Sequence, residues 1–119
     1  MKHKTIEAPE HLRPATAEWW RSVIQDYALE PHHVRLLTLA AEAFDRAMEA
    51  REALAAAGSL TYQTARGEPK PRPEVAIERD ARIGFARLLR ELALDVNAPA
   101  DEYSRPASAP MAPARKEVG

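Results

Sequence analysis

The stretch PHHVRLLTLAAEAFDRAMEAREALAAAG, which runs from Pro31 to Gly58, decides the fold. Its apolar residues recur at alternating spacings of three and four, which places them on one face of a helix. A second, alanine-rich line runs beside the first, so the helix is predicted to be buried on more than one side. Pro31 suits the first helical turn, and Gly58 suits a left-handed cap at the end. We therefore predict a central helix over 31–57 with two packing surfaces, one for its own chain and one for a neighbouring subunit.

A shorter amphipathic helix is predicted ahead of this central helix. Thr16 is its candidate N-cap, with Glu18 in the first turn, where the helix dipole favours a carboxylate. Trp19 and Trp20 could stack on nucleic-acid bases, but Trp20 lies on the apolar stripe, which favours an anchoring role. The stripe has the spacing i, i+3, i+4, i+7 and consists of Trp20, Val23, Ile24 and Tyr27.

The segment after Gly58 changes to the alternation of a β-strand over 60–64. Arg66 and Gly67 predict a turn, and residues 68–73 carry a proline at every second position, which favours an extended backbone. We therefore predict a β-hairpin over 59–73. It is the only segment with a net positive charge, with Arg66, Lys70 and Arg72 against Glu68. A phosphate-contacting arm and a solvated connector both fit this pattern.

A third helix is predicted from Pro73, and its apolar stripe consists of Ile77, Ala81, Gly84, Phe85, Leu88 and Leu92. The spacing of Glu78 and Arg82 allows a favourable i, i+4 ion pair. Gly84 predicts a close crossing with the alanine-rich side of the central helix. From Asn97 onward, prolines and alanines with scattered charges predict a disordered tail.

Together these elements predict a mainly α fold. The short, central and third helices form an antiparallel helical hairpin core with a small β-hairpin at its tip. The chain divides into an N-terminal arm (1–13), a helical oligomerisation core (14–96) that includes the β-hairpin, and the tail (97–119). A chain of 119 residues holds one domain, and oligomerisation would help a core this thin.

Several classes of function find no support in the sequence. The chain has no Cys, which excludes disulfides and thiolate sites. His32 and His33 are adjacent, so their side chains diverge by about 100° on a helix and suit exposure or an interface better than metal binding. No nucleophile–base pair or Gly-rich phosphate loop occurs, which predicts a protein that is not an enzyme and needs no cofactor. No signal peptide or membrane span is evident, so we expect a soluble intracellular protein.

The order and spacing of these features resemble the P27-type family of phage terminase small subunits from about Pro9 to Asp95. The chain departs from the family pattern at Arg72-Pro73, where Asn-Pro is usual, and at 93–97, where the family tends to carry Gly-Leu-Thr/Ser-Pro. The features that carry the resemblance are Leu12, Trp19-Trp20-(x)2-Val23, Leu37, Ala41, Ala43, Asp45-Arg46-(x)3-Ala50, Gly58, Leu60–Thr64, Gly67, Arg72-Pro73 and Leu88-Leu89-(x)2-Leu92.

The resemblance implies a non-enzymatic packaging factor in the cytoplasm of the bacterial host. Such proteins form homo-oligomeric rings, recognise viral double-stranded DNA and regulate the ATPase and nuclease of the large terminase subunit. A net charge of −1 does not by itself suggest a nucleic-acid binder, but a ring would multiply a small basic patch. The candidate DNA contacts are Lys2, His3, Lys4 and Arg13 from the arm, and Arg66, Lys70 and Arg72 from the hairpin.

Two alternatives remain open. A packaging adaptor that no longer binds DNA would act through protein contacts, and a helical oligomerisation module would have no role in packaging. In the adaptor, the tail is the natural docking segment for the large subunit. Its candidate docking residues are Tyr103, Arg105, Arg115 and Lys116.

Overall fold

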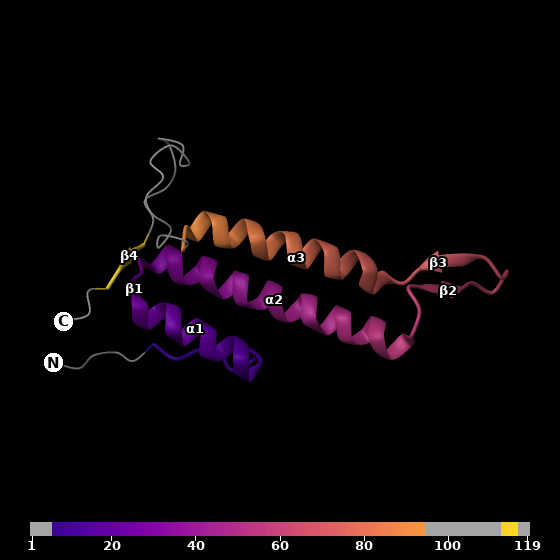
Figure 1. Cartoon of the computed structure of the whole chain (residues 1–119), viewed down its shortest axis with the longest axis horizontal. Helices are drawn as coiled ribbons and strands as arrows, with labels where there is room; N and C mark the ends of the chain where they lie inside the picture. The colour runs from indigo at the N-terminus through magenta and orange to yellow at the C-terminus, as the bar shows by residue number, and fades with distance from the viewer. Residues whose placement is uncertain (1–5, 95–112, 117–119) are drawn as a thin grey trace.

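Three helices lie side by side, and a β-hairpin projects from one end of them (Figure 1). The structure, a computed structural model, describes residues 6–94 and 113–116. The central helix α2 (Pro31–Ala57) is flanked by α1 (Pro14–Asp26) and α3 (Pro73–Leu92), and both run antiparallel to it. The molecule is elongated, with extents of 63 × 39 × 20 Å. The predicted mainly α fold with a helical core and a small hairpin is confirmed.

The central helix begins and ends where its sequence predicts. Pro31 occupies the first helical position, and Gly58 ends the helix with φ 72°, its N–H donating to the Leu54 carbonyl at 3.0 Å. The N-terminal end is closed by His33, whose Nδ1 accepts the backbone N–H of Glu30 at 3.0 Å. His32 is exposed, which is one of the two settings expected for these histidines, whereas His33 is buried within its own chain. His33 is thus the third residue of the helix in a capping box, a position usually held by Glu or Gln.

The first helix begins at Pro14, two residues before the predicted cap. Its N-cap residue is Arg13, which makes no side-chain capping hydrogen bond. The cap comes from α2 instead, because Asp45 accepts the Arg13 backbone N–H at 2.9 Å and the Thr16 hydroxyl at 2.5 Å. Thr16 is therefore a buried residue of the first turn and not the N-cap, which corrects the sequence prediction. The carboxylate also lies at the positive end of the α1 dipole.

The hydrophobic core lies where α1 covers α2, and it is small. Trp20, Leu37 and Leu92 are its largest fully buried side chains. The polar atoms at its edge are paired, because Trp20 Nε1 donates to Thr38 Oγ1 at 3.2 Å and the Tyr27 hydroxyl donates to the Leu94 carbonyl at 3.0 Å. The cluster consists of Leu12, Ala17, Trp20, Val23, Tyr27, Leu37, Ala41 and Leu92.

The third helix packs along α2 but contributes little to this core. Leu92 is its one fully buried residue, while Ile77 and Ile83 are each 39% exposed. Alanines at 40, 47 and 50 are buried along α2, where small side chains allow a neighbouring helix to approach. The close crossing predicted at Gly84 is wrong, because a Cβ added there would meet no atom within 4 Å.

The predicted hairpin consists of β2 (Thr61–Gln63) and β3 (Pro69–Pro71), which pair antiparallel. Tyr62 lies opposite Lys70 in this register. Gly67 turns the chain with φ 80°, a conformation that favours glycine. Pro69 and Pro71 lie on a strand that has a partner on one side only. The N–H that each proline lacks is therefore not needed to bond a further strand.

A second small sheet joins the connection between α1 and α2 to a segment near the C-terminus. The strand β1 (Tyr27–Ala28) links α1 to α2 and pairs antiparallel with β4 (Ala114–Arg115). No strand is predicted from the sequence in this part of the tail. Its proline- and alanine-rich composition carries no strand signal, and the pairing depends on an exposed edge at 27–28, far away in sequence.

Candidate nucleic-acid and assembly surfaces

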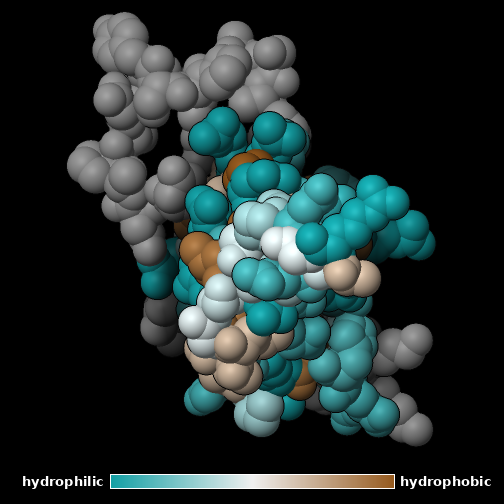
Figure 2. Space-filling model, turned by 90° about the vertical axis from the view of Figure 1, so that its right-hand side faces the viewer, coloured by the Kyte–Doolittle hydropathy of each residue, from teal (hydrophilic) through white to brown (hydrophobic). Residues whose placement is uncertain are grey.

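The hairpin is an exposed arm that carries basic residues. All six strand residues of β2 and β3 are exposed, and so is Arg66 in the turn between them. The turn is held by the Gly67 N–H, which donates to the Thr64 carbonyl at 2.8 Å, and by the Thr64 N–H, which donates to the Glu68 carbonyl at 2.9 Å. Seen from this end, the surface is largely hydrophilic, with small separate hydrophobic patches (Figure 2). Arg66 and Lys70 are thus free of any ion pair among the described residues and face solvent.

Arg72 holds the base of the hairpin and is only partly exposed. Its Nε donates to the Ser59 carbonyl at 2.8 Å, and its backbone N–H donates to the Leu60 carbonyl at 2.8 Å. These bonds join the start of β2 to the end of β3. Part of the guanidinium is therefore committed to the hairpin itself.

Arg13 is committed to a different contact, away from the hairpin. Its guanidinium donates to both carboxylate oxygens of Glu52, at 2.9 and 2.7 Å. This hydrogen bonding raises the pKa of Arg13 and lowers the pKa of Glu52. The structure therefore places Arg66, Lys70 and Arg72 along the hairpin, from its tip to its base, and Arg13 in a separate contact with α2. The other candidate contacts, Lys2, His3 and Lys4, lie outside the described residues.

The four tail residues predicted to dock the large subunit divide in the same way. Tyr103 and Arg105 lie outside the described residues. Arg115 is exposed and lies opposite Tyr27 in the β1–β4 register. Lys116 binds its own chain, because its N–H donates to the Asp26 carbonyl at 2.6 Å and its Nζ donates to the Ile24 carbonyl at 3.0 Å. A lysine at the C-terminal end of α1 also suits the helix dipole.

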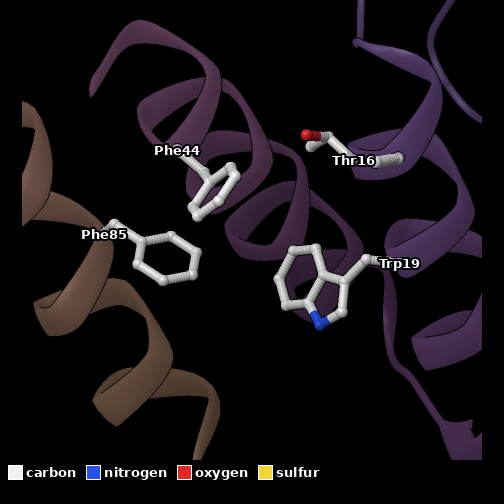
Figure 3. A pocket seen from close by; sticks show the side chains of 5 residues that line it. Thr16, Trp19, Phe44 and Phe85 are labelled. Atoms are coloured by element: carbon white, nitrogen blue, oxygen red, sulfur yellow. The ribbon is translucent and has the colours of Figure 1, made fainter. Parts of the chain in front are cut away.

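An apolar groove lies between the helices, with side chains from all three of them (Figure 3). Trp19 and Phe44 flank Phe85, with ring centroids 6.0 Å and 5.3 Å from it in tilted arrangements. Phe44 is 40% exposed although the sequence places it on the apolar face of α2. The groove has a volume of about 300 Å³ and is completed by Ala15 and Thr16. An aromatic cluster left open in this way is typical of a docking surface.

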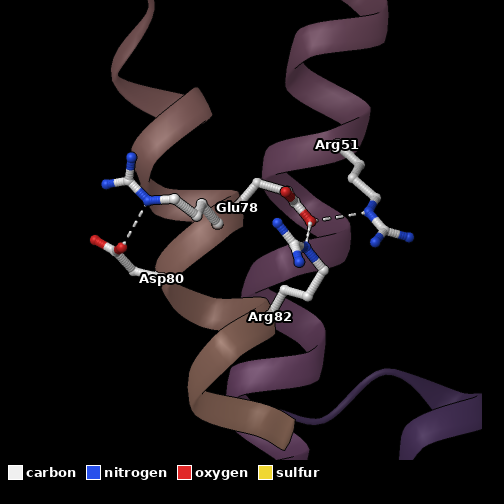
Figure 4. Close-up of polar contacts among 5 residues, drawn as sticks. Arg51, Glu78, Asp80 and Arg82 are labelled. Carbon is white, nitrogen blue, oxygen red and sulfur yellow. Dashed lines mark hydrogen bonds and ion pairs between the residues drawn. The ribbon is translucent and has the colours of Figure 1, made fainter.

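A carboxylate network fastens α3 to α2 beside the hairpin (Figure 4). Glu78 accepts Nε–H of Arg51 at 3.2 Å across the two helices and Nε–H of Arg82 at 3.3 Å within α3. The predicted pairing of Glu78 with Arg82 is thereby confirmed. Arg79 pairs with its neighbour Asp80 at 3.1 Å and takes no part in the network. The network therefore joins the first turns of α3 to the C-terminal half of α2.

Two features of these surfaces were not predicted from the sequence. Asp45 lies on the helix face that also carries Thr38 and Ala41, and a carboxylate at such a position signals a buried polar contact. Phe44 and Phe85 lie about equally far from the hairpin along the two antiparallel helices that it connects. Aligning these helices antiparallel in the sequence would have predicted that the two side chains are neighbours.

The described part of the chain holds no group of three or more His, Cys, Asp or Glu side chains placed to bind a metal ion. Within residues 6–94 and 113–116, no helix has the length and apolar character needed to cross a membrane.

The described residues thus present two exposed features, a hairpin that carries basic side chains and an aromatic groove between the helices. A family model described as phage terminase, small subunit, matches residues 15–101. The chain belongs to this family. Membership supports a role in the packaging of phage DNA, and small terminase subunits are generally non-catalytic. The P27 type within the family stays a prediction. Comparisons with curated proteins and with solved structures find no match.

Proposed function

We propose that this chain assembles into a homo-oligomeric ring that recognises viral DNA and regulates the large terminase subunit during genome packaging in the host cytoplasm. The observation that carries the proposal is the exposed hairpin with Arg66 and Lys70, which projects from the end of the helical pair (Figure 1). It has the shape and charge of an arm that contacts phosphates.

Assembly is supported by the way in which α3 is packed. A compact chain of this size would have a radius of gyration of about 13 Å, whereas this chain has 18.5 Å. Leu92 is the one fully buried residue of α3, and large apolar side chains elsewhere on α2 and α3 stay partly exposed. Such surface is stabilised when a second copy covers it. Closed rings arise when one patch of a subunit contacts a different patch of the next.

DNA recognition is supported by repetition of the arm. One subunit offers Arg66, Lys70 and the free part of Arg72, which is too little charge to hold a duplex firmly. A ring carries as many arms as it has subunits, and linked weak contacts bind far more tightly than a single one. A chain with a net charge of −1 can hold DNA in this way.

The test is a duplex titration by fluorescence anisotropy at two salt concentrations, with the mass of the protein fixed by light scattering. We expect a large assembly whose affinity falls steeply with salt. The variant Arg66→Glu with Lys70→Glu should bind more weakly and show a smaller salt slope, because each lost phosphate contact reduces the slope by about 1.

The matched control is Arg21→Glu, which reverses an exposed arginine of α1 without touching the hairpin. It should keep the affinity and salt slope of the wild type. A monomer in solution would refute the ring. Equal binding by the hairpin variant and Arg21→Glu would remove the hairpin from the DNA contact.

A packaging adaptor that acts through protein contacts alone is the second candidate. It is favoured by the internal use of two predicted DNA contacts, since Arg13 binds Glu52 and Arg72 binds Ser59. In this candidate the tail docks the large subunit through Tyr103, Arg105, Arg115 and Lys116. Lys116 would then have to leave α1. A large assembly that fails to bind duplex at low salt, and that loses the large subunit on deletion of 97–119, would establish the adaptor.

A further inference from the structure

The groove of Trp19, Phe44 and Phe85 has a chemistry that selects its occupant. Its volume of about 300 Å³ is twice that of a cavity that accepts benzene, so it can take one or two bulky side chains. Its polar groups are the Thr16 hydroxyl, which donates to Asp45, and the indole N–H of Trp19. A polar small molecule would therefore find few groups to orient it, whereas an apolar side chain from a protein surface fits.

The described part of the chain has exposed apolar side chains that could fill the groove of a second copy. They differ in their position along the helix axis, which is called their height below. A closed ring whose axis runs along the helices brings residues of equal height into contact. Ile83 is two residues from Phe85, about 3 Å along the axis. Ile77 is eight residues away, about 12 Å, and Leu39 is five residues from Phe44, roughly 7.5 Å. Of these three side chains, Ile83 has the height of the groove.

The direction and charge of this site agree with a contact between copies. Two helical positions correspond to about 200°, so Ile83 points away from the groove that its neighbour Phe85 lines. Arg87 lies one turn beyond Ile83 on the same face, and Glu18 lies beside Trp19 on α1. Both are exposed and neither has an ion-pair partner among residues 6–94 and 113–116. The two surfaces thus carry complementary charges at similar heights.

We propose that Ile83 of one subunit occupies the aromatic groove of the next, with Arg87 of the first subunit facing Glu18 of the second. This inference rests on the proposed ring and names the surfaces that build it. The contact is head-to-tail, because the outer face of α3 meets the groove between α1 and α3 of the neighbour. Contacts of this kind close into rings.

The first experiment compares Ile83→Ser with Ile77→Ser by light scattering over a range of concentrations. The two isoleucines lie on the same helix and are equally exposed, which makes Ile77→Ser a matched control. Ile83→Ser should weaken assembly at least tenfold, because a buried isoleucine is lost from every contact, while Ile77→Ser should assemble like the wild type. Circular dichroism checks that both keep their helices. Equal assembly of both variants would overturn the proposal.

The second experiment uses the absence of cysteine from the chain. The variant that combines Ala15→Cys with Ile83→Cys places one thiol on the rim of the groove and the other on the outer face of α3. Mild oxidation should give a ladder of covalent multimers on a non-reducing gel, while Ala15→Cys with Ile77→Cys should not. An assembled protein without a ladder would overturn this contact and leave the ring intact. A monomeric wild type would refute the ring and this contact together.

A charge exchange tests the same contact without changing the groove. Glu18→Arg and Arg87→Glu should each weaken assembly, and the double variant should restore it, because the ion pair is rebuilt with its charges exchanged. Single variants that assemble like the wild type, or a double variant no better than either, would contradict the facing of Arg87 and Glu18.

Discussion

Asp45 holds the N-terminal end of α1 from outside that helix, so its replacement should loosen α1 from α2. The carboxylate is 6% exposed and accepts two hydrogen bonds, from the Arg13 backbone N–H at 2.9 Å and from the Thr16 hydroxyl at 2.5 Å. Asp45→Ala removes both acceptors. The Thr16 hydroxyl, in a residue only 4% exposed, then loses its partner.

The magnitude follows from these two bonds. A hydrogen bond to a charged group contributes about 1.5–3 kcal/mol, and the loss of a helix cap costs about 1 kcal/mol. The two estimates overlap, because one of the bonds is the cap, so we expect Asp45→Ala to lower the free energy of unfolding by about 3 kcal/mol. In a domain near 100 residues this corresponds to a fall in Tm of roughly 12–24 °C. Total stabilities are about 5–15 kcal/mol, so the loss is large but compatible with folding.

The assay is urea unfolding followed by circular dichroism and tryptophan fluorescence at one subunit concentration, since assembly makes stability concentration-dependent. Thr16→Val should cost about 1–2 kcal/mol alone, and the double variant should lose less than the sum of the single losses. Glu49→Ala, which removes an exposed carboxylate one turn further along α2, should change stability by less than about 0.5 kcal/mol. Equal effects of Asp45→Ala and Glu49→Ala, or full additivity with Thr16→Val, would refute the capping role.

Three other substitutions test the contacts that surround this core. Glu52→Gln removes a carboxylate whose pKa is lowered by its hydrogen bonds from Arg13. The stabilisation from this carboxylate is present above its ordinary pKa of 4.5 and is lost as the pH falls through its folded-state pKa. The unfolding curves of variant and wild type should therefore differ at pH 7 and converge in acid. Curves that stay apart in acid would contradict that source of stability. Glu78→Gln should cost about 1 kcal/mol and speed amide exchange in the first turns of α3, because Glu78 joins Arg51 and Arg82 there; Glu74→Gln is the control, and equal exchange in both variants would speak against the network. Gly84→Ala should raise stability by about 0.5–1 kcal/mol in denaturant unfolding, because a Cβ meets no atom within 4 Å and alanine favours a helix. A loss of stability there would mean that another surface packs against Gly84.

The elements that the sequence predicted correctly carry their signals within a few residues. The bounds of α2 follow from Pro31 and Gly58, because a proline at the first position and a left-handed glycine each act on the backbone locally. The hairpin follows from strand alternation and from Gly67, which adopts φ 80°. Such features depend little on what packs around them, so the mainly α fold can be predicted from the amino-acid sequence alone.

The features that were missed depend on residues distant in sequence. Thr16 has the chemistry of an N-cap, but the capping carboxylate of Asp45 comes from another helix and shifts the start of α1 to Pro14. A glycine within a helix often marks a close helix crossing, yet the space beside Gly84 is open. The sequence alone does not distinguish a glycine at a crossing from one beside open space. The start of α1 and the packing beside Gly84 both depend on how the helices lie against one another. The spacing of apolar residues along a single helix does not predict that arrangement.

The candidate DNA site shows the same division between residue type and availability. Counting basic residues identified the hairpin as the positive segment, and the structure shows that its strands are exposed. The count did not reveal that Arg13 is neutralised by Glu52 or that Arg72 binds the Ser59 carbonyl. Charge is a property of the residue, whereas availability to phosphate is a property of its neighbours.

The charges that remain available imply that duplex binding and assembly should be lost together. Arg66 and Lys70 of one chain can neutralise about two phosphates, which corresponds to a salt slope of about −1.8 and to weak binding. Each further copy adds the same pair, so affinity should appear only with the ring. Ile83→Ser leaves the hairpin unchanged, yet it should abolish duplex binding at concentrations where the wild type is assembled and bound, while Ile77→Ser should bind normally. Duplex binding by a monomeric Ile83→Ser protein would mean that one chain suffices, and that basic residues outside the hairpin carry the DNA contact.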